Sequence, residues 1–322
     1  MKTGSKFLKG FASLALIALV AAVAACASDS SGDTGGAASD AGITDRGYAN
    51  SSRLVSATWL TEHLDDDNLL VVDLRNEDDY NAGHIPGAVR LTAGTTFQTE
   101  DANGVPGMLP SADHIASALS AIGAKPTDTI IFYDGSSNLW SSRALWALDV
   151  YRHADSRLLD GAWNYWSAHE LVSTTDATAV TASSYAFSGS ANTNLIAGWE
   201  EILASVDDPS KIVCDARSPE EFSGKDVRAA NGGHIPESAN VNWNRAVNAE
   251  GEFLPASELK TIYESEGIQG DKVVFTLCQT AVRATHSWFV LQELLGYQTV
   301  KVYDGSWVEW GNRDDLPITT RG

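Results

Sequence analysis

Four landmarks occur twice in the chain in the same order, and this internal repeat constrains the fold more than any other feature of the sequence. Each copy contains an apolar run that ends in Asp-x-Arg, a Gly-His-Ile-Pro segment, a second apolar run, and Asp-Gly-x-Trp. The landmarks lie at 69–75, 83–86, 130–134 and 160–163 in the first copy, and at 211–217, 233–236, 274–278 and 304–307 in the second. A duplicated domain explains all four.

Each copy carries the pattern of an α/β domain. Short β-branched runs alternate with helical patterns, which is typical of a parallel sheet flanked by helices. We expect one domain at 52–172, another at 193–322, and a connection at 173–192, where Ser, Thr and Ala dominate without periodicity. Helices are predicted at 56–64, 111–121, 195–206 and 255–264, several of them opened by Ser or Pro.

The beginning of the chain has the pattern of an export segment. Three lysines precede an apolar stretch at 11–23, which is too short to span a bilayer. We therefore predict a signal peptide at 1–25. Residues 23–26, Val-Ala-Ala-Cys, resemble a bacterial lipobox, in which Cys26 would be acylated after cleavage and would anchor the protein to a membrane. The alternative is an ordinary signal peptide with an incidental Cys26, and both interpretations export the protein to the bacterial cell envelope.

Residues 26–51 follow as a predicted flexible tether, since Ser, Gly, Ala and Asp dominate and large apolar residues are rare. The formal net charge of the whole chain is -20. Such a charge argues against nucleic acid as a partner, because backbone phosphates would be repelled. If Cys26 is acylated, two thiols remain, Cys214 and Cys278, which is too few for a disulfide scaffold. Cys214 lies in an apolar run and is expected to be packing.

Cys278 stands where an α/β fold places ligands. The strand predicted at 273–277 leads directly into it, and a helical pattern that stops at Gly296 follows. Backbone N–H groups and the positive end of the helix would favour a thiolate, and also a persulfide anion, at this position. The alternative is a buried structural cysteine. The predicted cradle for the sulfur consists of Gln279, Thr280, Ala281, Val282 and Arg283.

Together these motifs resemble the tandem rhodanese family, and the resemblance covers about residues 53 to 320. In that family the first domain lacks the catalytic cysteine and the second carries sulfur as a persulfide, and Asp134 accordingly stands where the first copy would need a thiol. The resemblance implies that Cys278 takes the outer sulfur of thiosulfate, releases sulfite, and passes the sulfur to cyanide or a thiol by ping-pong catalysis. A sulfane-sulfur carrier or binding module without turnover is the alternative from another class.

The length of the loop separates two chemistries that this fold supports. Related phosphatases and arsenate reductases hold five residues between the Cys and the Arg, which makes a cradle for a phosphate-sized oxyanion. Four residues separate Cys278 from Arg283 here. The shorter loop favours transfer of a sulfur atom.

The resemblance also implies arginines that bind the anionic donor. Arg217, which ends the second Asp-x-Arg, matches the family's substrate-binding arginine, and Arg228 is a candidate second anion clamp. For both, the alternative is an ion pair with a neighbouring acid. Thiosulfate enzymes often show Arg-Lys-Gly after the cysteine and mercaptopyruvate enzymes Gly-Ser-Gly, whereas this loop contains Gln-Thr-Ala. Arg283 favours thiosulfate as the donor, and 3-mercaptopyruvate stays the alternative. Ala281 stands where Gly is usual, so the sequence leaves the conformation of the loop open.

The remaining polar landmarks are expected to be structural. Asp73 and Asp215 end strands, and His84 and His234 belong to the two Gly-His-Ile-Pro segments. The sequence shows no Cys/His spacing typical of zinc, so no metal and no cofactor is predicted.

Overall fold

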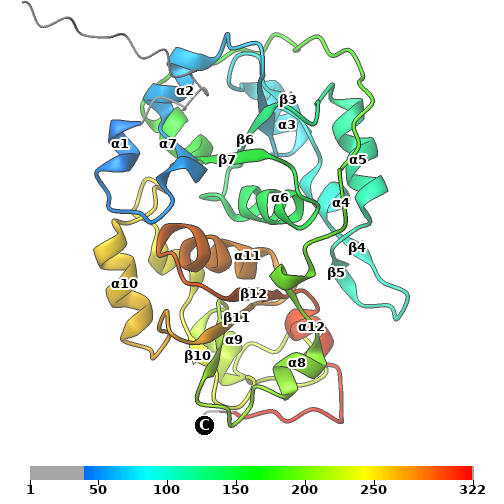
Figure 1. Cartoon of the computed structure of the whole chain (residues 1–322), viewed down its shortest axis with the longest axis vertical. Coiled ribbons are helices and arrows are strands. Elements are labelled where there is room, and N and C mark those ends of the chain that lie inside the picture. The colour runs from blue at the N-terminus through cyan, green and yellow to red at the C-terminus, as the bar shows by residue number, and fades with distance from the viewer. Residues whose placement is uncertain (1–39, 321–322) are drawn as a thin grey trace, which may run out of the picture. The chain divides into compact units, whose positions relative to one another are not determined.

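The computed structural model describes residues 40–320, and in this part of the chain each copy of the repeat forms a five-stranded parallel sheet flanked by helices (Figure 1). The strand order is β1-β7-β6-β2-β3 in the first sheet and β8-β12-β11-β9-β10 in the second, so equivalent strands occupy equivalent places. The predicted α/β duplication is confirmed. The strands are β1 (Leu54–Val55), β2 (Leu69–Asp73), β3 (Val89–Arg90), β6 (Thr129–Tyr133) and β7 (Asp155–Leu159), then β8 (Ile196–Ala197), β9 (Lys211–Asp215), β10 (Ala239–Asn240), β11 (Val273–Leu277) and β12 (Val300–Tyr303).

The helices alternate with these strands along the chain. The first domain contains α2 (Ala57–His63), α3 (Glu77–Ala82), α4 (Ala93–Phe97), α5 (Ala112–Ala121), α6 (Leu139–Val150) and α7 (Ala162–Ala168). The second contains α8 (Trp199–Leu203), α9 (Pro219–Ser223), α10 (Ala256–Glu264), α11 (Val282–Phe289), a π-helical turn (Val290–Leu294) and α12 (Ser306–Trp310). A small antiparallel pair, β4 (Thr99–Glu100) with β5 (Pro106–Met108), extends from the first domain.

Three of the four predicted helices are confirmed almost to the residue, because polar side chains or a proline mark their starts. Ser56 and Ser111 cap α2 and α5 by accepting hydrogen bonds from backbone N–H groups, and Pro255 precedes α10. The helix predicted at 195–206 is shorter, since α8 begins only after Gly198. A short 3-10 turn and strand β8 occupy the residues before that glycine.

The parallel register brings three landmarks of the second copy to one edge of its sheet. Strand β11 lies between β9 and β12, with Leu277 paired to Asp215 and Thr276 paired to Val302. The strands therefore end together, and the segments that follow them lie at one edge. These segments are the Asp-x-Arg motif, the cysteine loop, and Asp-Gly-Ser-Trp.

The end of the predicted tether belongs to the fold. Within residues 40–51, Ile43 and Tyr48 are buried, and Arg46 forms ion pairs with Asp160 of the first domain (2.5 Å) and Glu252 of the second (2.7 Å). Burial of apolar side chains and the neutralisation of a buried acid explain why a segment of low complexity becomes ordered. The predicted signal peptide and Cys26 lie outside the described residues. Within residues 40–320, no helix is both long and apolar enough to cross a bilayer.

A buried ion pair joins the two domains, which pack against each other through α6 and α11 (Figure 1). The guanidinium of Arg143 binds the carboxylate of Asp304 at 2.6 Å, and both side chains are almost fully buried. Arg143 also donates hydrogen bonds to the carbonyl oxygens of Phe97 and Gly107. The first domain is thereby attached to the Asp-Gly-Ser-Trp segment of the second.

We predict that Arg143→Ala destabilises the protein by about 3–5 kcal/mol, because it leaves the Asp304 carboxylate buried without its partner. The control is Arg245→Ala, which removes an exposed ion pair with Glu266 and should change stability by less than about 1 kcal/mol. Urea unfolding followed by tryptophan fluorescence measures both. Equal effects of the two substitutions would contradict this assignment.

Candidate active site

The backbone of Cys278 is held in place by the Asp-Gly-Ser-Trp segment. Cys278 lies between the end of β11 and the start of α11, and its N–H donates to the hydroxyl of Ser306 at 3.2 Å. Its carbonyl oxygen accepts from the N–H of Trp307 at 2.9 Å. The first copy repeats the second contact, because the N–H of Trp163 donates to the carbonyl oxygen of Asp134 at 2.9 Å. The repeat therefore places residues 134 and 278 in equivalent backbone positions.

The loop after Cys278 contains one left-handed residue. Ala281 has a φ of +63° and directly precedes Val282, the first residue of α11. Asn138 directly precedes α6 in the first copy and has a φ of +67°. Ala281 therefore adopts the left-handed conformation that glycine favours, at a cost of about 1–2 kcal/mol. Such a cost is tolerated where the surrounding structure requires the conformation.

The first domain covers the cysteine loop. The side-chain amide of Gln98 donates to the carbonyl oxygen of Thr280 at 2.8 Å. A Cβ atom added to Gly107 would lie 2.9 Å from the Cβ atom of Thr280, so the two segments are in close contact. Cys278 itself is only 1% exposed. Cys278 therefore lies buried at the predicted sheet edge, in a loop that a segment of the other domain contacts at Thr280.

Arg283 lies beside the sulfur and is bound by an acid that the sequence analysis did not single out. Its guanidinium donates to both carboxylate oxygens of Glu221, at 2.6 and 2.9 Å. Burial opposes the charge of Arg283, but Glu221 and the Cys278 sulfur together raise the pKa of Arg283 above its usual value. Glu221 stands three residues after Ser218 in a capping box, and this spacing is the sequence feature that could have revealed it.

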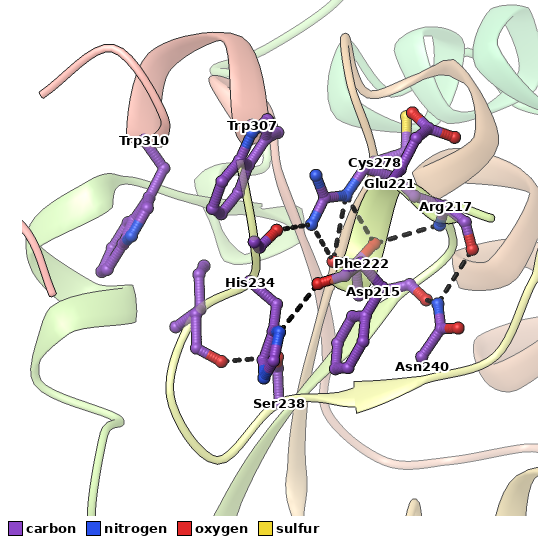
Figure 2. A network of polar contacts seen from close by, with 12 residues as sticks. Asp215, Arg217, Glu221, Phe222, His234, Ser238, Asn240, Cys278, Trp307 and Trp310 are labelled. Carbon is purple, nitrogen blue, oxygen red and sulfur yellow. Dashed lines mark hydrogen bonds and ion pairs between the residues drawn. The ribbon is translucent and has the colours of Figure 1, made fainter. Parts of the chain in front are cut away.

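Arg217 lies in a buried polar network next to the cysteine loop, and its substrate-binding role stays a prediction. Its guanidinium binds Asp215 and the carbonyl oxygen of Gly233, lies over the ring of Trp307, and is 1% exposed (Figure 2). In the first copy, which has no cysteine at this position, Arg75 makes the same set of contacts, with Asp73, Gly83 and Trp163. The shared network indicates a structural role, which was the alternative for Arg217.

Arg228 does lie at the loop, on the longer segment that distinguishes the second copy. Its carbonyl oxygen accepts a hydrogen bond from the side-chain amide of Gln279 at 2.9 Å. Its guanidinium is half exposed, binds Asp226 at 2.5 Å, and lies 3.4 Å from Glu221. Arg228 is therefore placed at the rim of the site, with much of its charge already paired.

In the first copy, a carboxylate fills the place that corresponds to the thiol. Asp134 is buried, and its Oδ1 accepts from the N–H groups of Ser136 (2.7 Å) and Asn138 (3.0 Å). Its Oδ2 accepts from those of Trp140 (2.7 Å) and Ser141 (3.0 Å). Burial raises the pKa of the Asp134 carboxyl, and the four amide donors act against this effect. The backbone N–H groups that follow this strand are thus bound to the side chain of Asp134, which belongs to the same loop.

The other candidates are structural, as expected. Cys214 is fully buried in β9, and burial together with Asp215 raises the pKa of its thiol far above the usual value. The rings of His84 and His234 stack on Tyr80 and Phe222. Within residues 40–320, no group of three or more His, Cys, Asp or Glu side chains is arranged to hold a metal ion.

Comparisons with known proteins agree with the duplicated domain. The model of the rhodanese-like domain matches residues 56–169 and 199–313. The chain is 35% identical over 287 residues to a thiosulfate sulfurtransferase of Corynebacterium glutamicum, over 85% of this chain and 92% of that protein. It is 34% identical over 285 residues to a sulfur carrier protein of Thermus thermophilus, over 84% of this chain and 98% of that protein.

Solved structures show a similar fold. A structure of an anaerobic ergothioneine biosynthesis enzyme from Chlorobium limicola, bound to trimethyl histidine, superposes with a TM-score of 0.75 over 85% of this chain and 71% of that one. The sequence identity is 21%, so this likeness concerns the fold.

We predict that the Glu221–Arg283 pair makes stability depend on pH. Burial favours the neutral form of the Glu221 carboxyl. Arg283, the N–H of Ser218 and Arg228 outweigh this effect and lower the pKa of Glu221. Its stabilising effect is therefore complete above the ordinary glutamate pKa of about 4.3 and is lost as the pH falls through the lowered value.

Urea unfolding between pH 3 and 7 measures this effect by comparing wild type with Glu221→Gln. The wild type should be more stable by about 3 kcal/mol near neutrality, and the difference should shrink under acid conditions. Glu220→Gln, on the exposed side of the same helix, is the control. A difference that stayed constant down to pH 3 would contradict the assignment.

Proposed function

The chain belongs to the rhodanese-like domain family, and on that premise we propose that it is a sulfurtransferase in which Cys278 carries sulfane sulfur as a persulfide. The observation that carries this proposal is the carboxylate of Asp134. Four backbone N–H groups of the first copy converge on the side-chain oxygens of Asp134, at the position equivalent to Cys278. A loop of this construction favours an anion there by its amide dipoles and by the helix that follows.

The same construction supports a persulfide anion on the second copy. The loop of the first copy is one residue longer. We therefore match the N–H groups of the two copies by counting from the end of the strand and from the start of the helix. In the second copy they belong to Thr280, Ala281, Arg283 and Ala284. Oriented donors of this kind stabilise developing charge without reorganising during the reaction.

The proposed reaction proceeds in two displacements. The Cys278 thiolate attacks the outer sulfur of thiosulfate, a new S–S bond forms, and the bond within thiosulfate breaks so that sulfite leaves with the electron pair. A thiol or cyanide then attacks the outer sulfur of the persulfide, and the thiolate of Cys278 is regenerated. Atoms and electrons balance without an added oxidant or reductant.

The charges around the loop favour a small anionic donor. Arg283 lies beside the sulfur and Arg228 lies at the rim, so both can attract sulfonate oxygens. The short loop between Cys278 and Arg283 fits a transferred sulfur atom. We propose thiosulfate as the preferred donor, with 3-mercaptopyruvate as the alternative.

The burial of Cys278 adds a condition to this proposal. Only 1% of the residue is exposed, and Gln98 and Gly107 of the first domain lie against Thr280. A donor must contact the sulfur, so residues around Cys278 have to shift when the donor enters. Movements of active-site loops are common steps of enzyme cycles.

A sulfur carrier is the second candidate function, and two observations favour it. The relative from Thermus thermophilus is named a sulfur carrier protein, and Cys278 is 1% exposed, so a persulfide there would be protected from solvent. Multiple turnovers with small acceptors support the enzyme, whereas a single stoichiometric release of sulfite supports the carrier.

We predict that Cys278→Ser lowers the formation of thiocyanate from thiosulfate and cyanide by roughly a thousandfold or more, because the covalent carrier of sulfur is lost. Mass spectrometry of the thiosulfate-treated wild type should find one added sulfur on the peptide that contains Cys278. Cys214→Ser is the matched control and should keep its activity. Turnover by Cys278→Ser at the wild-type rate would refute the proposal, and rates with 3-mercaptopyruvate would decide between the donors.

We also propose export and lipid anchoring, on the pattern of residues 1–26 alone. In bacteria that express the full chain, the wild type should be found in the membrane fraction and Cys26→Ser in the soluble exported fraction. Metabolic labelling with a fatty acid measures the anchor directly. Equal fractionation of both proteins would contradict the role of Cys26.

A further inference from the structure

We propose that Glu221 is a positioning residue that acts through Arg283, because its fixed carboxylate keeps the guanidinium beside the sulfur of Cys278. This inference rests on the proposed function, since it assigns the residue that organises the charge of the sulfur site. Glu221 does not act on the donor itself. It acts on the orientation of the arginine that does.

The carboxylate of Glu221 is itself immobilised. Its Oε2 accepts from the N–H of Ser218 at 3.1 Å, while the N–H of Glu221 donates to the hydroxyl of Ser218 at 3.2 Å. The side chain is 1% exposed. A carboxylate held in this way offers two oxygens in a fixed plane, and the planar guanidinium of Arg283 matches them at 2.6 and 2.9 Å.

The ion pair with Glu221 restricts the positions that the guanidinium of Arg283 can occupy. A long arginine side chain at the second position of a helix would otherwise sample many conformations, several of them in solvent. Arg283 is 18% exposed while Glu221 holds it. The arginine is thus placed between a buried acid and the reactive sulfur, and the order needed for the reaction exists before the donor arrives.

The first copy provides an internal comparison. Asp79 stands where Glu221 stands in the repeat, and it completes the same helix start by donating its N–H to Asn76. Asp79 is nevertheless exposed, and Trp140 occupies the helix position of Arg283. A helix start of this fold therefore does not require the buried acid–arginine pair. The pair occurs in the copy that carries the cysteine.

The charged groups near the sulfur come from several elements. Arg283 lies on α11 and Glu221 on α9, and the longer segment contributes Arg228 and Asp226, which are paired at the rim. Asp304, beside α12, is neutralised by Arg143 of the first domain. Among these groups, Arg283 is the one whose pKa the sulfur of Cys278 raises. Loss of Glu221 should therefore act on the sulfur chiefly through that arginine.

The test is a double-mutant cycle with Glu221→Gln, Arg283→Gln and the double variant. Two quantities are measured for each: the rate of sulfite release from thiosulfate in a single turnover, and the pH at which the Cys278 thiolate forms, followed by its ultraviolet absorbance. Glu220→Gln is the control, because this neighbour on α9 is exposed. Thermal unfolding checks that each variant is folded, and Glu221→Asp replaces Glu221→Gln if the latter is not.

We expect Glu221→Gln to slow sulfite release roughly tenfold to a hundredfold, which corresponds to losing a charge-assisted interaction. Thiolate formation should move to higher pH, as in Arg283→Gln, and the double variant should resemble Arg283→Gln alone. Unchanged thiolate formation in Glu221→Gln, or effects that multiply in the double variant, would overturn the proposal. If the wild type gains no sulfur from thiosulfate or from 3-mercaptopyruvate, the sulfurtransferase function fails, while the thiolate measurement still decides the role of Glu221.

Discussion

The structure depends on the convergence of backbone N–H groups at the point where a central parallel strand turns into a helix. Such a turn leaves amide donors without partners inside the helix, and a negative group is the natural acceptor for them. The first domain supplies that group as a fixed carboxylate, Asp134. The second domain places Cys278 at the equivalent position, where a sulfur anion can form and react.

The two domains share one backbone arrangement but differ in the side chains that they place in it. The domain without the cysteine has closed its cradle on Asp134, but its α6 and the segment at 97–108 contact the other domain. Arg143 ties that segment to Asp304, which begins the Asp-Gly-Ser-Trp segment that holds the backbone of Cys278. The domain without the cysteine therefore still contributes to the environment of the sulfur.

The fold and the position of Cys278 could be predicted from the sequence, because both follow from local patterns that occur in both copies of the repeat. The full set of partners that Arg217 and Arg283 bind could not be predicted in this way. Arg217 ends a motif that resembles a substrate-binding element, and its partner Asp215 is local, but the carbonyl oxygen of Gly233 is brought to it only by the fold. Glu221 is 62 residues from Arg283, and only the folded chain shows that they meet. The burial of Cys278 and the contacts of the first domain with Thr280 are likewise visible only in the folded chain.

The central claim is that the amides after β11 hold an anionic sulfur on Cys278. A crystal structure of the thiosulfate-treated protein tests this most directly. We expect one extra sulfur bonded to Sγ, within hydrogen-bonding distance of backbone nitrogens at Thr280, Ala281, Arg283 or Ala284. An unmodified thiol, or an added sulfur that points away from all four, would contradict it.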